Sequence, residues 1–173
     1  LGMGTTLVAV QLAGDQFNLA WVGDSRAYRI GMGCIEPLSR DHSWVQEMVD
    51  AGEMSTSQAR QHPRRNVITQ CLGQAEHEPQ PGVLVGKLQP GEILLLCSDG
   101  LSGELTDAQI LELCGQAETL DGLVSQLVKA ANQNGGRDNV SCIVLARTAP
   151  PANVEPGRRS LLGYLFPRRK RNR

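Results

Sequence analysis

The stretch EILLLCSDGL (residues 92–101) contains an apolar run that stops abruptly at an acidic corner. Residues 93–97 are all apolar and follow a Pro-Gly turn pair. The run is too short for a buried helix, so it predicts a β-strand that is covered on both faces. Asp99 then follows almost directly, and a carboxylate there costs free energy unless hydrogen-bond donors or a cation meet it. Asp-Gly is a common turn pair, but a carboxylate on a rigid strand end also suits a metal ligand.

The chain around this stretch shows clusters of strand patterns and pairs of helix patterns, without the strand–helix alternation of a parallel sheet. Ser55 with Gln58 has the spacing of a capping box, and Thr106 is placed as the N-cap of a later helix. The first strands are expected to form an antiparallel meander, with a tight corner at residues 23–25. The pattern predicts an α+β fold in which helices cover antiparallel sheet. The expected strands are 5–12, 16–22, 26–30, 66–73, 82–88, 93–97 and 139–147, and the expected helices are 43–52, 55–63, 106–114 and 121–136.

Charge divides the 173-residue chain into an acidic body and a basic tail. Residues 1–149 hold 10 Lys and Arg against 17 Asp and Glu, whereas residues 150–173 hold 7 against 1. We expect a folded domain at 1–148, a Pro-rich linker at 149–157 and a basic tail at 158–173. The tail is either a solubilising extension or an attachment to an anionic surface, most plausibly membrane lipid. No nucleic-acid recognition motif accompanies the charge.

The cysteines and the apolar runs indicate the cellular compartment in which the protein is located. The five cysteines show no CxxC spacing and several stand in apolar runs, which predicts buried free thiols rather than disulfides or a zinc site. The sequence shows no signal peptide and no run of transmembrane length, so a cytoplasmic location is expected.

Three aspartates share one local pattern: Asp24 in WVGDSR, Asp99 in LLLCSDGL and Asp138 in GGRDNVSCIVL. Each stands between an apolar strand and a corner rich in glycine or polar residues. If neighbouring strands bring these ends to one edge of a sheet, the carboxylates need a cation, because like charges at close range cannot all remain ionised. Oxygen ligands without His or Cys indicate Mg²⁺ or Mn²⁺ rather than zinc. The alternative is three separate turn aspartates.

The same segments, together with GMGTTLVAV and the stretch from LSRDHSW to CLG, resemble the metal-dependent protein phosphatases. The similarity covers residues 2–147 and is greatest to the bacterial and cyanobacterial branch of the type 2C serine/threonine phosphatases. It implies an antiparallel β-sandwich flanked by helices, with a binuclear Mn²⁺/Mg²⁺ centre at one end. By this resemblance Asp99 and Asp138 bind one core metal ion, and Asp24 belongs to a third, weaker position.

The activity implied by the resemblance is hydrolysis of phosphoserine and phosphothreonine by a metal-activated water. Residues 41–66 match the family's flap over the substrate, which makes His62, Arg64, Arg65 and Asn66 candidates for substrate binding. The alternative for these residues is a solvated basic corner. His42 is expected to be a structural hydrogen-bonding residue, and His77 to be part of a loop.

The family's upstream signatures, which supply an Arg, further acidic ligands and a His, do not occur in this sequence, and the chain begins with Leu1. We therefore expect a fragment that lacks N-terminal strands and helices and is inactive alone. The expected partners of the whole protein are phosphorylated proteins from a Ser/Thr kinase pathway, and the expected state is a monomer. The alternative function is that of a pseudophosphatase that binds phosphoproteins without hydrolysing them.

Overall fold

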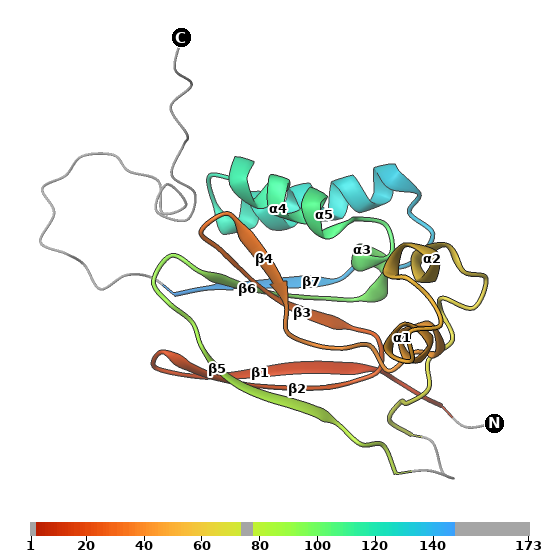
Figure 1. The fold of residues 1–173 in the computed structure, drawn as a ribbon. Helices are drawn as coiled ribbons and strands as arrows, with labels where there is room; N and C mark the ends of the chain where they lie inside the picture. The colour runs from red at the N-terminus through yellow and green to blue at the C-terminus, as the bar shows by residue number, and fades with distance from the viewer. Residues whose placement is uncertain (1–2, 74–77, 148–173) are drawn as a thin grey trace, which may run out of the picture.

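The computed structural model describes residues 3–73 and 78–147. The predicted linker and basic tail lie outside these residues, as do the expectations about them. The strands are β1 Leu7–Ala13, β2 Gln16–Val22, β3 Arg26–Gly31, β4 Cys34–Pro37, β5 Gly82–Lys87, β6 Ile93–Cys97 and β7 Cys142–Ala146, and the helices are α1 Trp44–Asp50, α2 Thr56–Gln61, α3 Asp99–Ser102, α4 Asp107–Gln116 and α5 Leu120–Asn134 (Figure 1).

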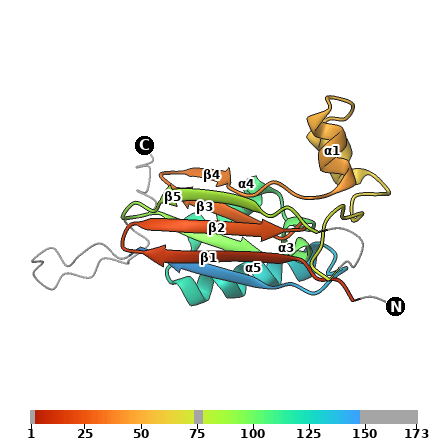
Figure 2. The same cartoon turned by 90° about the horizontal axis from the view of Figure 1, so that it is seen from below.

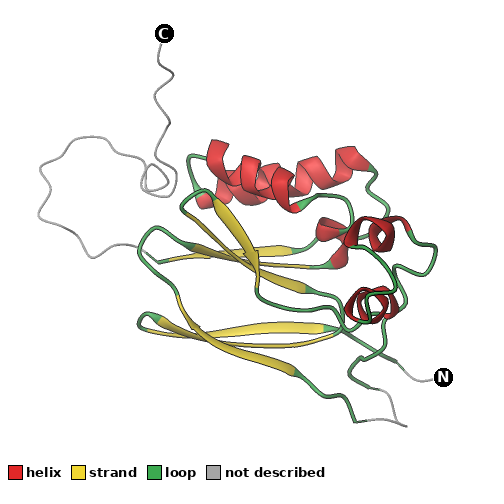
Figure 3. Ribbon diagram, viewed as in Figure 1, coloured by secondary structure: helices red, strands yellow, loops and turns green. Residues whose placement is uncertain are grey.

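The strands form two antiparallel sheets that pack face to face, and helices cover one of them (Figure 3). One sheet has the order β1-β2-β5 and the other β4-β3-β6-β7. Figure 2 shows the three-stranded sheet in front of the four-stranded one, with α5 behind both. The prediction of an α+β fold with antiparallel sheets and flanking helices is therefore confirmed.

Strand β6 shows why its sequence is apolar throughout: it lies between two separate core layers, and all five of its residues are buried. Ile93, Leu95 and Cys97 face α4 and α5, while Leu94 and Leu96 face the three-stranded sheet. Successive side chains of a strand point to opposite faces, so a strand in the middle layer must be apolar at every position. The strand predicted at 93–97 is therefore present and covered on both faces, and it belongs to the sheet that forms the middle layer of the molecule.

The corner after β2 departs from the predicted meander. Strand β2 pairs with β1 and β5, whereas β3 pairs with β4 and β6, so the corner carries the chain from one sheet to the other. Gly23 makes this crossing with φ +104, and a Cβ there would lie 2.3 Å from Thr6 Cγ2. Only glycine combines that conformation with so close a neighbour.

Two further expectations were wrong. Residues 66–73 form no strand, and their ladder contacts are the isolated bridges Ser43–Ile68 and Thr5–Leu72. The last predicted strand is present as β7, which pairs with β6 alone at a sheet edge and leaves Ile143 59% exposed. Cys34 is exposed, whereas the cysteines were predicted to be buried. The other part of that prediction is confirmed, because all five cysteines are free thiols.

The helix boundaries agree closely with the sequence signals. Both α2 and α4 open with complete capping boxes, from Ser55 to Gln58 and from Thr106 to Gln109. Helix α5 buries Leu123, Leu127 and Ala131 against the four-stranded sheet. Within the described residues, no helix has both the length and the apolar character needed to cross a membrane.

Candidate active site

A cleft of about 430 Å³ opens at the end of the sheets where α1, α2 and α3 gather (Figure 1). One side of it, the strand-end wall, carries Asp24, Asp99 and Asp138. The other side is the two-helix segment, residues 41–66, which includes α1 and α2. Figure 2 shows α1 projecting beyond the ends of the strands, so the segment overhangs the acidic wall rather than covering a sheet.

The strand-end wall places Asp99 and Asp138 on adjoining pieces of backbone. Asp99 begins α3 directly after β6. Ser98 Oγ donates to Asn139 O at 3.2 Å and accepts from Ser141 N at 3.0 Å, which ties the two corners together. A Cβ on buried Gly100 would lie 2.3 Å from Asn139 O, so glycine is required for the close approach of the two chains. The glycine of the Ser-Asp-Gly corner therefore serves packing against the Asp138 corner.

Asp24 reaches the same cleft from the crossing corner between the sheets. Burial and, next, the negative charge of Asp99 raise the pKa of Asp24 from 3.8 to about 6. The corner is held by His42, whose ring Nδ1 accepts from Gly23 N at 3.3 Å and whose backbone N–H donates to Gly23 O at 2.9 Å. His42 is thus the structural hydrogen-bonding residue expected from its place in the sequence. The negative charge of Asp99 is therefore close enough to Asp24 to disfavour the ionised form of the Asp24 carboxyl group.

The donor set of this wall is chemically suited to a hard divalent cation. Its carboxylates supply oxygen ligands, and the mutual repulsion of Asp24 and Asp99 is the kind that a cation relieves. Among the described residues, however, no three His, Cys, Asp or Glu side chains are arranged to hold one metal ion together. The residues present therefore fit part of a Mn²⁺ or Mg²⁺ site, and the assignment of Asp24, Asp99 and Asp138 as metal ligands stays a prediction.

An ion pair that the sequence did not predict joins the two walls. Arg26, at the start of β3, donates from Nε to Asp41 Oδ1 at 2.8 Å and from a terminal nitrogen to Asp41 Oδ2 at 2.7 Å. Its other terminal nitrogen donates to the Tyr28 hydroxyl at 3.2 Å. Despite the desolvation, the hydrogen bonds to Asp41 raise the pKa of Arg26, so the guanidinium stays charged. The pair fixes the base of the two-helix segment against the strand that follows Asp24.

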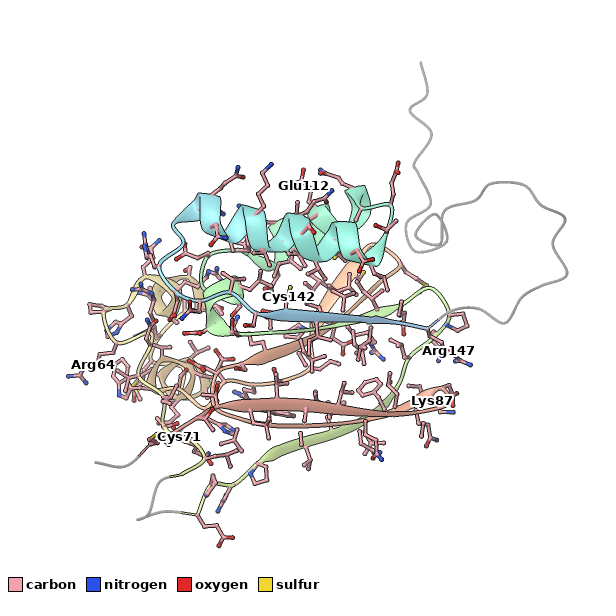
Figure 4. All side chains as sticks on the ribbon, turned by 180° about the vertical axis from the view of Figure 1, so that it is seen from behind. Arg64, Cys71, Lys87, Glu112, Cys142 and Arg147 are labelled. Carbon is pink, nitrogen blue, oxygen red and sulfur yellow. The ribbon has the colours of Figure 1, made fainter. Side chains whose placement is uncertain are left out.

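The four substrate candidates of the two-helix segment divide into two groups. Arg65 and Asn66 line the cleft. His62 and Arg64 lie outside its lining and pack on the ring of Trp44, with the His62 ring 4.9 Å and the Arg64 guanidinium 5.1 Å from the ring centre. Figure 4 shows Arg64 at the outer edge of the molecule.

Two further basic residues of the cleft were missed by sequence reasoning. Arg60 of α2 donates to Ser102 O at 3.1 Å and Leu105 O at 3.0 Å, which connects the two-helix segment to the end of α3. Arg137, beside Asp138, also lines the cleft. The signal for Arg60 was weak, because its partners are backbone carbonyls more than 40 residues away in the chain. The adjacency of Arg137 to Asp138 was visible in the sequence.

Comparison with known proteins agrees with this architecture. The sequence profile of the protein phosphatase 2C family matches residues 2–144, and the chain belongs to this family. A serine/threonine phosphatase stp of Listeria innocua is 38% identical over 146 residues, which are 84% of this chain and 58% of that protein. The serine/threonine protein phosphatase PstP of Mycobacterium tuberculosis is 37% identical over 143 residues, 83% of this chain and 27% of that protein.

Comparison with solved structures also identifies serine/threonine phosphatases as similar proteins. The serine/threonine phosphatase Stp1 of Staphylococcus aureus superposes with a TM-score of 0.80 at 34% identity, over 84% of this chain and 57% of that one. A PstP catalytic domain in complex with two manganese ions gives a TM-score of 0.72 at 34% identity, over 82% and 57% of the respective chains. The chain thus spans somewhat more than half the length of the Listeria relative and of these structures.

Proposed function

We propose that the protein to which this chain belongs is a Mn²⁺- or Mg²⁺-dependent protein serine/threonine phosphatase that hydrolyses phosphoserine and phosphothreonine in other proteins. The observation that carries the proposal is the convergence of Asp24, Asp99 and Asp138 on one cleft in a chain of the protein phosphatase 2C family. The similar PstP domain crystallised with two manganese ions supports the choice of metal. Segments outside this chain would complete the ligand set.

The residues of the chain have separable tasks in this proposal. Asp24, Asp99 and Asp138 offer oxygen donors on backbone that Ser98, His42 and Gly100 hold in place. A divalent cation bound there would supply Lewis acidity toward water and the phosphoryl group. Arg65 and Asn66 face the cleft from the opposite wall and can donate hydrogen bonds to phosphoryl oxygens. A site between a fixed acidic wall and an overhanging segment suits a phosphorylated side chain that reaches in from a protein surface.

The test is a set of charge-removing, size-conserving substitutions in the full-length protein. Asp99→Asn and Asp138→Asn should each lower Mn²⁺-dependent hydrolysis of a small phosphate ester by about a hundred-fold or more, because the cation contributes several kcal/mol to transition-state stabilisation. Asp24→Asn should have a smaller effect at saturating Mn²⁺. Asp121→Asn, in the exposed first turn of α5, is the matched control and should leave the rate unchanged. Wild-type turnover in either of the first two variants would overturn the proposal.

A second candidate function is binding of phosphoproteins without hydrolysis. It is favoured by one observation, namely that the described residues contain no group of three side chains able to hold a metal ion. The two functions differ in a simple measurement on the full-length protein. A pseudophosphatase would retain phosphopeptide affinity with no turnover at any Mn²⁺ or Mg²⁺ concentration, whereas the phosphatase would release inorganic phosphate.

A further inference from the structure

Cys97 and Cys142 are register partners on neighbouring antiparallel strands, β6 and β7. Both side chains belong to the core layer between the four-stranded sheet and the helices, so they point to the same face of the sheet. Both are free thiols in the structure. Their alignment is a property of the sheet register and does not depend on loop geometry.

The hydrogen-bond pattern shows which kind of pair they form. Cys97 and Cys142 are the last register partners of the ladder, and beyond them Ser98 N donates to Ser141 O at 3.0 Å. Hydrogen-bonded and non-hydrogen-bonded pairs alternate along an antiparallel ladder, so Cys97 and Cys142 occupy a non-hydrogen-bonded position. At such positions the Cα atoms are about 4.5 Å apart and the side chains approach most closely. A disulfide requires Cα atoms about 4.4–6.8 Å apart, so the two thiols can be bridged with little movement of the backbone.

Solvent exposure and the positions of the other cysteines favour a disulfide between Cys97 and Cys142 over other pairings. Cys97 is 3% exposed, but Cys142 is only half-buried and stands on an edge strand of the four-stranded sheet. Figure 4 shows Cys142 on β7, beneath α5. Cys34 lies on β4, at the opposite edge of that sheet, and Cys71 lies in the loop that bridges to Thr5. Cys114 shares the helix-side core layer and is the competitor that an experiment must separate.

We propose that Cys97 and Cys142 are a dithiol modification site, which a low-molecular-weight disulfide oxidises to a cross-strand disulfide. The Cys142 sulfur, after losing its proton, attacks one sulfur of the oxidant, breaks its S–S bond and releases one thiol. The Cys97 sulfur then attacks the Cys142 sulfur of the mixed disulfide and displaces the second thiol. One S–S bond is broken and one is formed, and the two protons of the cysteine thiols leave on the two released thiols.

The position of the bond gives it structural significance. The disulfide would lie one residue from the hydrogen bonds between Ser98 and Ser141 and two residues from Asp99, at the strand ends that carry the acidic corners. A cross-link there would restrain the two backbone segments that place Asp99 and Asp138. The modification goes beyond the proposed hydrolysis, because it requires neither a cation nor turnover.

The experiment uses the native chain and oxidised glutathione, followed by alkylation of the remaining thiols and peptide mapping by mass spectrometry. Trypsin releases Cys142 in the peptide 138–147, and a glutamate-specific protease cuts at Glu104 and so separates Cys97 from Cys114. We expect the 138–147 peptide joined to the peptide that contains Cys97, a loss of the mass of two hydrogen atoms from the protein, and recovery of both thiols with dithiothreitol.

Single cysteine substitutions show which two thiols form the disulfide. Cys114→Ser should keep the cross-link, and Cys142→Ser should abolish it. If a variant fails to fold, the peptide map of the unsubstituted chain still identifies the linked cysteines. Three results would overturn the proposal: both thiols alkylated after oxidation, Cys142 joined to Cys114 instead, or glutathione retained on Cys142 with Cys97 alkylated.

Discussion

The two walls of the cleft are held in different ways. The strand-end wall rests on β6, which is buried at every position, and its corners are joined by main-chain and serine hydrogen bonds. The two-helix segment buries one residue from each helix, Val45 from α1 and Ala59 from α2. It is attached through the Arg26–Asp41 pair at its base and through Arg60 near its far end. The acidic groups are therefore on the more deeply buried side of the cleft, and the substrate candidates Arg65 and Asn66 are on the side that we expect to open at lower free energy.

The largest expected effect comes from the core beneath the acidic wall. Leu95→Ala removes a fully buried side chain between β6 and the helices and should lower the free energy of unfolding by about 3 kcal/mol. Val45→Ala in α1 is the matched change on the other wall and should cost about 1.5 kcal/mol, since it removes two methyl groups from a less enclosed site. Urea unfolding of both variants measures the difference. Equal costs would show that the two walls are equally embedded.

The contrast between the walls also marks what the sequence could predict. The β6 layer and the helix starts at Ser55 and Thr106 follow from local patterns, because apolar runs and capping boxes act over a few residues. The crossing at Gly23 did not follow, since turn chemistry fixes a corner but not the sheet to which the next strand pairs. Residues 66–73 carry strand-like residues yet pair only at isolated bridges.

The candidate site shows the same limit. The acidic corners were visible as strand ends, and the structure brings all three to one cleft. Arg26 with Asp41 and Arg60 with two carbonyls join residues 15 to 45 positions apart. Such contacts depend on the tertiary arrangement, and a single sequence has no periodic signal for them. Likewise, the raised pKa of Asp24 depends on burial and on Asp99, which only the folded chain brings near.

The next prediction tests the connection between the walls. Arg26→Gln leaves the Asp41 carboxylate, which is 12% exposed, without its bidentate partner. We expect a loss of about 2 kcal/mol of unfolding free energy, less than for a fully buried pair because the Arg26 side chain is 28% exposed. Arg26→Lys keeps the charge but loses the paired geometry, and it should recover part of that loss.

A double-mutant cycle isolates the pair itself. Arg26→Gln combined with Asp41→Asn should cost less than the sum of the single changes, since the second change removes the unpaired charge left by the first. Strict additivity in urea unfolding would show that the pair does not couple the two walls.

A kinetic prediction separates the basic residues of the two-helix segment. Arg65 lines the cleft, whereas Arg64 stacks on Trp44 outside it. In the full-length protein, Arg65→Gln should raise KM for a phosphopeptide about tenfold, the scale of one charge-assisted hydrogen bond, and should change small-ester hydrolysis less. Arg64→Gln is the matched control and should change the phosphopeptide KM by less than about threefold. A larger effect of Arg64 would mean that the segment presents its outer face to the substrate.

The smallest effect, and the most direct test of the comparison, uses the two capping boxes. Ser55 Oγ accepts from Gln58 N and Thr106 Oγ1 accepts from Gln109 N, both at 3.3 Å, so the two caps are equivalent in geometry. Removing either by substitution with alanine should destabilise its own helix by about 1 kcal/mol.

Helix α4 buries Ile110 and Cys114 in the core, so Thr106→Ala should lower the global unfolding free energy by nearly that amount. Helix α2 buries Ala59 alone and lies in the two-helix segment, so Ser55→Ala should mainly speed amide hydrogen exchange there and shift the global transition by less than about 0.5 kcal/mol. Because the local cost is the same, any difference between the global shifts reports how strongly each helix is coupled to the core. Equal global shifts would mean that the two-helix segment unfolds together with the sheets, and the distinction between the walls would then fail.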